Sequence, residues 1–115
     1  MSGVLAILVT GGMVATVSPT GANASGSGVP PTPFLLTTNS VTVSVQGGNG
    51  PYTYAWSNVA GTLVNVTSPT AATTTFSKTE PPGTSIFATY RCTVTDSRGR
   101  TASVDVPVAM LFLEA

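Results

Sequence analysis

Residues 40–57 carry the pattern that most narrows the possible folds. Valines occupy every second position of 41–45, and aromatic residues occupy every second position of 52–56, beyond a glycine-rich turn. Because successive side chains of a β-strand point to opposite faces of its sheet, this alternation predicts two half-buried strands. Trp56, the only tryptophan, is predicted to lie in the core, and Tyr52 and Tyr54 share its face.

The remainder of the chain continues as short strands separated by turns. Strands are predicted at 62–67, 71–77 and 86–95, followed by a closing strand within 101–115. Residues 96–100, "DSRGR", predict a tight hairpin with Gly99 in the left-handed conformation. No segment of ten or more residues has helical periodicity, so the sequence predicts an all-β fold of the β-sandwich type. The core face of 86–95 is predicted to consist of Ala88, Tyr90, Cys92 and Val94.

The first 33 residues are predicted to form a separate part of the chain. Apolar runs at 3–10 and 13–18 flank Gly11 and Gly12, a pattern typical of a β-hairpin. Residues 18–33 have the composition of a flexible linker, or of an extended arm laid along a neighbouring subunit. The predicted organisation is an arm, hairpin and linker over 1–33 and a β-sandwich over 34–115. The apolar runs are shorter than the roughly twenty residues of a membrane-spanning helix, so no membrane span is predicted.

Charged side chains are scarce and unevenly placed. They make up 7% of the chain and sum to zero, and the first of them is Lys78. Since near-zero net charge favours association, such a surface suits a protein that is covered by other protein. The chain also has no basic patch, which excludes nucleic-acid binding through phosphate neutralisation.

Both ends of the chain are predicted to contain strands that are apolar on both faces, at 4–9 and 108–115. An exposed strand of this kind promotes aggregation, so both are expected to be covered. Residues 108–115 are predicted to pair with 4–9 of the same chain or of a neighbouring copy. The predicted assembly interface comprises Val4, Leu5, Ile7, Leu8, Val9, Met110, Leu111, Phe112 and Leu113.

Three segments, "GGNGPYTYAW", "SPTAATTTFS" and "YRCTVTDSRGRTASVDVPV", resemble the immunoglobulin-like/PKD-like β-sandwich module found in tailed-bacteriophage virion proteins. The resemblance covers Phe34 to Val108. It implies an immunoglobulin-like sandwich in which the Trp56 strand faces the strand bearing Tyr90 and Cys92. It also implies that Tyr90 forms a tyrosine corner. A valine stands where antibody-type domains place the disulfide partner of Cys92, which argues against an antibody-type role.

Catalytic and metal-binding chemistry is not predicted. The chain has no histidine, the usual general base and metal ligand. Asp96 is expected to cap the hairpin turn and Asp105 to face solvent from mid-strand. Cys92 is expected to be a buried small hydrophobe rather than a reactive thiol. We therefore expect no enzyme activity, no cofactor and no metal.

The predicted function is that of a non-enzymatic structural subunit of a virion, an immunoglobulin-like capsid decoration or a tail or fibre component. Its expected partners are other virion proteins and copies of itself. The alternative is a carbohydrate- or cell-surface-binding module, which would present exposed, coplanar aromatic rings to a host surface glycan. A secreted bacterial surface protein is a third, weaker possibility. Arg98 and Arg100, with Arg91 nearby on the paired strand, form the one positive cluster. This cluster is compatible with contact to an acidic partner surface or with a turn exposed to solvent. The candidate contact residues are Asn49, Tyr52, Tyr54, Asn58, Arg98 and Arg100.

Overall fold

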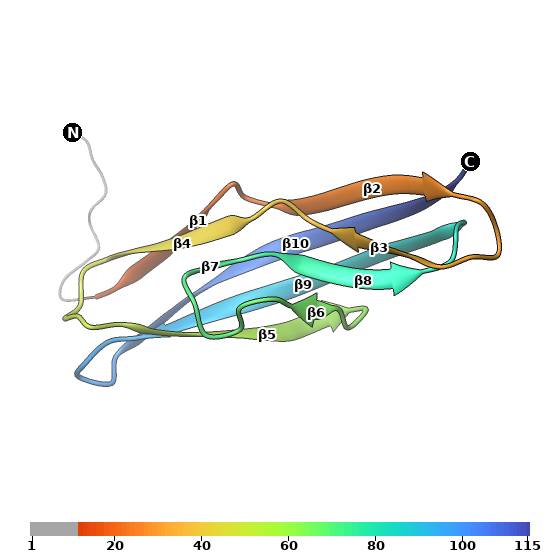
Figure 1. Ribbon diagram of the computed structural model, residues 1–115. Helices are drawn as coiled ribbons and strands as arrows, with labels where there is room; N and C mark the ends of the chain where they lie inside the picture. The colour runs from red at the N-terminus through yellow and green to blue at the C-terminus, as the bar shows by residue number, and fades with distance from the viewer. Residues whose placement is uncertain (1–11) are drawn as a thin grey trace.

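The computed structural model describes residues 12–115, which form two packed layers of β-strands (Figure 1). One layer is a four-stranded sheet of order β2-β10-β9-β5, and the other consists of the sheets β1-β4-β7 and β3-β8-β6. The predicted all-β sandwich is confirmed. The strands are β1 Val14–Ser18, β2 Ala22–Gly28, β3 Phe34–Thr37, β4 Val41–Gln46, β5 Thr53–Gly61, β6 Asn65–Val66, β7 Thr73–Thr74, β8 Phe76–Glu80, β9 Thr84–Thr95 and β10 Thr101–Glu114.

The first two strands change layers. β1 runs antiparallel to β4 in one layer, whereas β2 runs parallel to β10 in the other. β9 and β10 form a long hairpin from Thr84↔Phe112 to Thr95↔Thr101. Gly99 in its turn has a positive φ of 83°, as predicted. The described chain therefore begins beside this hairpin at one end of the sandwich and finishes at the opposite end (Figure 1).

The prediction that residues 18–33 form a linker or an arm on a neighbouring subunit is wrong for β2. Ala22–Gly28 is a strand of the four-stranded sheet, paired with Val108–Glu114 of the same chain. The predicted pairing of residues 108–115 with 4–9 is therefore also wrong, because β10 lies between β2 and β9 and both of its edges are occupied. Its small residues suit a crowded place, because a Cβ on Gly26 would lie 2.8 Å from Leu36 Cδ2. Residues 13–18 do form a strand, but β1 pairs with β4. The predicted hairpin partner, 3–10, lies outside the described residues.

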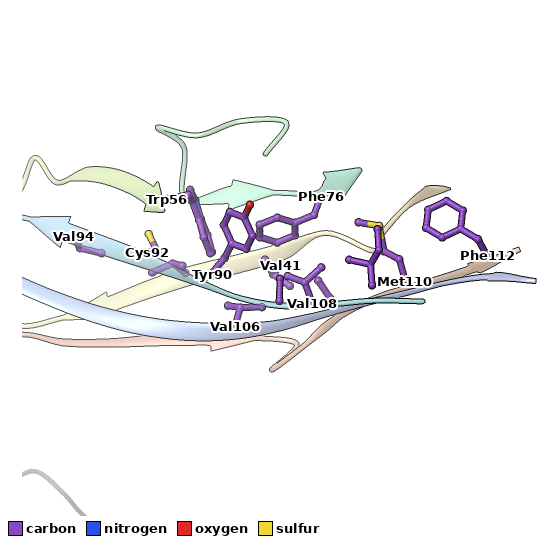
Figure 2. Packing of buried hydrophobic residues seen from close by; sticks show 14 residues of the cluster. Val41, Trp56, Phe76, Tyr90, Cys92, Val94, Val106, Val108, Met110 and Phe112 are labelled. Atoms are coloured by element: carbon purple, nitrogen blue, oxygen red, sulfur yellow. The ribbon is translucent and has the colours of Figure 1, made fainter. Parts of the chain in front are cut away.

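The core lies between the layers and is centred on three aromatic rings (Figure 2). The Phe76 ring packs edge-on against Trp56, with centroids 5.7 Å apart, and lies 5.2 Å from Tyr90. Trp56 is 8% exposed, and its Nε1 donates a hydrogen bond to the Ala71 carbonyl. The predicted core position of Trp56 is confirmed, as is the predicted core face of β9: Ala88, Tyr90, Cys92 and Val94.

Tyr90 and Cys92 have structural roles. The Tyr90 hydroxyl accepts a hydrogen bond from Val64 N and donates one to Val64 O. It therefore fastens a segment 26 residues upstream, and the tyrosine corner, whose bond spans a few residues, is not the arrangement found. Cys92 lies opposite Trp56 on the neighbouring strand. Burial raises the pKa of its thiol to about 11, although the Ala55 backbone hydrogen bond opposes this shift. The predicted buried cysteine is confirmed.

Residues 12–115 contain no helix with the length and apolarity that a membrane span requires.

Candidate interaction surface

An exposed apolar surface lies on the outer face of the four-stranded sheet, in the half nearest the C-terminus. Val106, Val108, Met110 and Phe112 of β10 are buried, so the intervening residues point outward. Phe87 on β9 lies directly opposite Ala109, and Leu111 lies opposite Ser85. Phe87 is 63% exposed and Leu113 is 50% exposed. We call Phe87, Ala109, Leu111 and Leu113 the outer apolar patch.

An ion pair marks the border of this patch. Arg91 and Asp105 face each other across β9 and β10, and Arg91 Nε and Nη2 donate to the two carboxylate oxygens at 2.7 and 3.1 Å. The hydrogen bond from Arg91 lowers the pKa of Asp105, and the same bond raises the pKa of Arg91. From this pair toward the C-terminus, the described outward-facing side chains of the sheet are uncharged: Asn23, Ser25, Ser27, Ser85, Thr89 and Pro107 with the patch itself.

A shallow hollow adjoins the patch at the edge strand β2. It is lined by Asn23, Ala24 and Ser25 of β2 and by Ala109 and Leu111 of β10. The surface is depressed here because the side chains of β2 are smaller than the neighbouring Leu111 side chain. The outer face therefore offers an apolar ridge next to an uncharged depression.

The predicted assembly interface is only partly found on this surface. Leu111 and Leu113 are exposed on it, as an interface requires. Met110 and Phe112 are instead buried in the protein's own core, and the Phe112 ring lies 5.4 Å from that of Phe34. The expectation that they contact another subunit is wrong, because the other layer of the sandwich already covers that side of β10. Val4, Leu5, Ile7, Leu8 and Val9 lie outside the described residues.

The aromatic residues of β5 do not form an open platform. Tyr52 and Tyr54 are half-buried and pack against the core, as their shared phase with Trp56 predicts. The Tyr52 hydroxyl donates to Gly47 O at 2.7 Å. Asn58 uses its side-chain amide to hold the backbone of its own strand end, donating to Ala60 O and Thr62 O. These side chains lack the exposed, coplanar rings that stacking on a sugar requires.

Asp96 organises the hairpin end of the molecule. Its side chain is fully buried, and the carboxylate accepts hydrogen bonds from the backbone N–H groups of Asn49, Arg98 and Arg100 and from Arg100 Nε. Burial alone would raise the pKa of Asp96, but these donors together outweigh it and lower the pKa to about 2. The predicted turn cap is confirmed, and the same group also ties the hairpin to the β4–β5 turn.

The predicted positive cluster is largely neutralised. Arg91 pairs with Asp105, and Arg100 pairs with Asp96 while also donating from Nη2 to Asn49 Oδ1 at 3.1 Å. Arg98 is exposed in the turn. Hence Arg91 and Arg100 are each paired within the chain, and the arrangement does not present three arginines together to an acidic partner.

A second hollow lies over the sheet β3-β8-β6, where Leu35 and Leu63 are 61% and 70% exposed. Lys78 and Glu80 form an ion pair at 3.2 Å on the same sheet, so this region contains the charge that the outer apolar patch lacks. Within residues 12–115, no three side chains among Cys, Asp and Glu gather in a group that could hold a metal ion.

Comparison with known proteins gives one family match. The sequence model of the SprB repeat matches residues 37–61, which span β4, the following turn and β5. Neither a curated protein nor a solved structure matches the chain. Together with the two-layered fold, the match supports a β-sandwich module of the immunoglobulin-like repeat type.

Phe87 and Ala109 belong to the outer apolar patch but were not predicted as interface residues, and Phe87 is the larger and more exposed of the two. The signal was present, since period-two alternation places Phe87 on the face opposite Ala88 and Tyr90. A large aromatic residue on the solvent-facing side of a strand is the feature that would have identified it.

Proposed function

We propose that the chain is a non-enzymatic structural module that acts by binding neighbouring protein copies through the outer apolar patch. The observation that carries this proposal is the concentration of Phe87, Leu111 and Leu113 on one uncharged half of a sheet face. Exposed apolar clusters of this kind are typical of protein–protein contact sites. The Asp96 and Asp105 carboxylates are already paired, with Arg100 and Arg91 respectively.

The setting that we propose is a virus particle, where the module would decorate a capsid or form part of a tail or fibre. Two features support it. The sequence resembles the sandwich modules of tailed-phage virion proteins, and residues 1–77 contain no charged side chain. A surface of this kind is suited to being enclosed by other subunits.

A second candidate is a repeat module within a longer surface protein. The match of residues 37–61 to the SprB repeat favours it. The geometry is also suitable, because the described chain begins and finishes at opposite ends of the sandwich (Figure 1). Modules with this arrangement can follow one another in a line without folding back.

The test is the solution mass of the full chain, measured by light scattering over a range of concentrations. The structural-subunit proposal expects a defined oligomer, and expects that Leu111→Lys returns the protein to a monomer. Ser103→Lys is the matched control, because Ser103 also faces outward from β10 but lies on the hairpin side of Asp105. A wild-type chain that stays monomeric throughout would contradict self-association and favour the repeat module.

A further inference from the structure

The outer apolar patch is too small to hold two copies together face to face. Its exposed side chains offer on the order of 300 Å² of apolar surface, whereas each partner of a stable interface contributes about 800 Å². Stable self-association through this face therefore needs additional contact area. An apolar, uncharged segment would match this face, because the outward-facing side chains between the Arg91–Asp105 pair and Leu113 are uncharged.

Residues 4–9, "VLAILV", have these properties. The segment is uncharged and contains five large aliphatic side chains in six residues. If extended, it would present apolar groups on both faces, so one face could lie on a sheet while the other is covered by a further neighbour.

The segment cannot cover the C-terminal part of the patch of its own chain, which is formed by Leu111 and Leu113. Gly12 lies at the hairpin end, because a Cβ on Gly47 would meet the Gly12 carbonyl oxygen and Asn49 is bonded to Asp96. From that end, Leu113 is about 40 Å away along β10, at about 3.3 Å per residue. Val4 is eight residues from Gly12 and reaches at most about 29 Å when fully extended. The segment would therefore end before Leu111 and Leu113.

We propose that Val4–Val9 of one copy lies on the outer apolar patch of a second copy, with an aliphatic side chain seated in the hollow between β2 and Leu111. This inference rests on the proposed self-association and identifies the segment responsible for it. When Val4–Val9 of each copy binds the patch of another copy, the contact area between copies increases, and no charged side chain of the segment is buried.

Disulfide cross-linking between two single-cysteine variants tests this arrangement. Ile7→Cys and Leu111→Cys are purified separately, one with a size tag, mixed and oxidised. The native Cys92 is fully buried, and the wild-type chain treated in the same way measures any background from it. A mixture of Ile7→Cys with Ser103→Cys is the matched control, since position 103 is exposed on the same strand but lies outside the patch. The expected result is a heterodimer band for the 7/111 mixture that is lost in the 7/103 mixture.

Three results would overturn the proposal, and they separate it from the proposed function. If light scattering shows an oligomer but the 7/111 mixture gives no heterodimer, self-association stands and the role of the segment is wrong. If the protein is monomeric and no heterodimer forms, both proposals fail. The third result concerns the competing hairpin about Gly11 and Gly12, which places Ile7 opposite Thr16. An intrachain disulfide in Ile7→Cys/Thr16→Cys that forms in preference to the 7/111 heterodimer would place the segment on its own β1.

Discussion

The hairpin end and the C-terminal end of the sandwich are stabilised by different interactions. At the hairpin end, the Asp96 carboxylate receives four hydrogen bonds and joins two turns. At the C-terminal end, the rings of Phe34 and Phe112 pack together, and the outer face is apolar as well. At the hairpin end, the buried carboxylate has all its hydrogen-bond partners within the chain. At the C-terminal end, apolar side chains remain exposed on the outer face. Under the proposed function, the C-terminal end is therefore the end that would contact a partner.

The largest effect is expected from removing the packing at the C-terminal end. Phe112→Ala should lower the free energy of unfolding by about 3–5 kcal/mol, because the fully buried ring leaves a cavity beside Phe34. Urea unfolding followed by tryptophan fluorescence measures the loss. Leu113→Ala, at the neighbouring half-exposed position, should cost less than about 1 kcal/mol. Equal losses of unfolding free energy in the two variants would contradict the assignment of Phe112 to the core face and Leu113 to the outer face of β10.

The next effect is expected at Asp96 and depends on pH. In Asp96→Asn the single amide oxygen can serve only one of the two pairs of donors, so the hairpin end should be destabilised. The folded pKa of about 2 lies below the ordinary value of 3.8. The ionised group therefore contributes stability above about pH 4 and loses it as the pH falls toward 2.

Urea unfolding of the wild type and Asp96→Asn between pH 7 and pH 2 checks this prediction. The two stability curves should converge as the acid limit is approached. Parallel curves would show that the Asp96 charge does not contribute in the folded state. Asp105→Asn provides the control, since its carboxylate is exposed and should change the pH dependence less.

Two glycines with similar backbones allow the ends to be compared directly. Gly61 and Gly99 have φ values of 78° and 83°. Gly99→Ala should cost about 1–2 kcal/mol, the strain of a left-handed residue, because no atom lies near the added methyl group. Gly61→Ala should cost more, since its Cβ would collide with the Phe87 carbonyl oxygen on β9. Thermal unfolding ranks the variants, and a larger loss for Gly99→Ala would contradict the close approach at Gly61.

The smallest effect is expected at the border between the two halves of the outer face. Arg91→Ala should change stability little, because the Arg91–Asp105 pair is exposed and solvent screens its attraction. Urea unfolding at low and high salt measures the effect, which should shrink further as salt rises. A large loss that does not respond to salt would show that the pair is more than a surface contact.

The sequence predicted the sandwich well where alternation was regular. The valines of β4, the aromatics of β5 and the core face of β9 all lie as their period of two indicates. The turn at Gly99 and the cap at Asp96 were also predictable, because their requirements are local.

What could not be predicted depended on neighbours distant in sequence. Ala22–Gly28 has no apolar alternation, and its strand conformation comes from parallel pairing with β10 and from space that only small residues fit. Met110 and Leu111 look alike in a run that is apolar on both faces. Only the position of the second layer determines that Met110 is buried and Leu111 is exposed. The candidate interface was therefore predicted on the correct strand but only partly on the correct face.

The parallel pairing of β2 with β10 has a mechanical consequence. A pulling force applied at Ala22 and at Glu114 acts in opposite directions along these two neighbouring strands, because the strands are parallel and Glu114 lies at the end of the pair opposite Ala22. The force is then perpendicular to the hydrogen bonds between the strands, so the seven paired positions from Val108 to Glu114 resist it together rather than opening one after another. The pairing of β2 with β10 therefore opposes stretching along the length of these two strands.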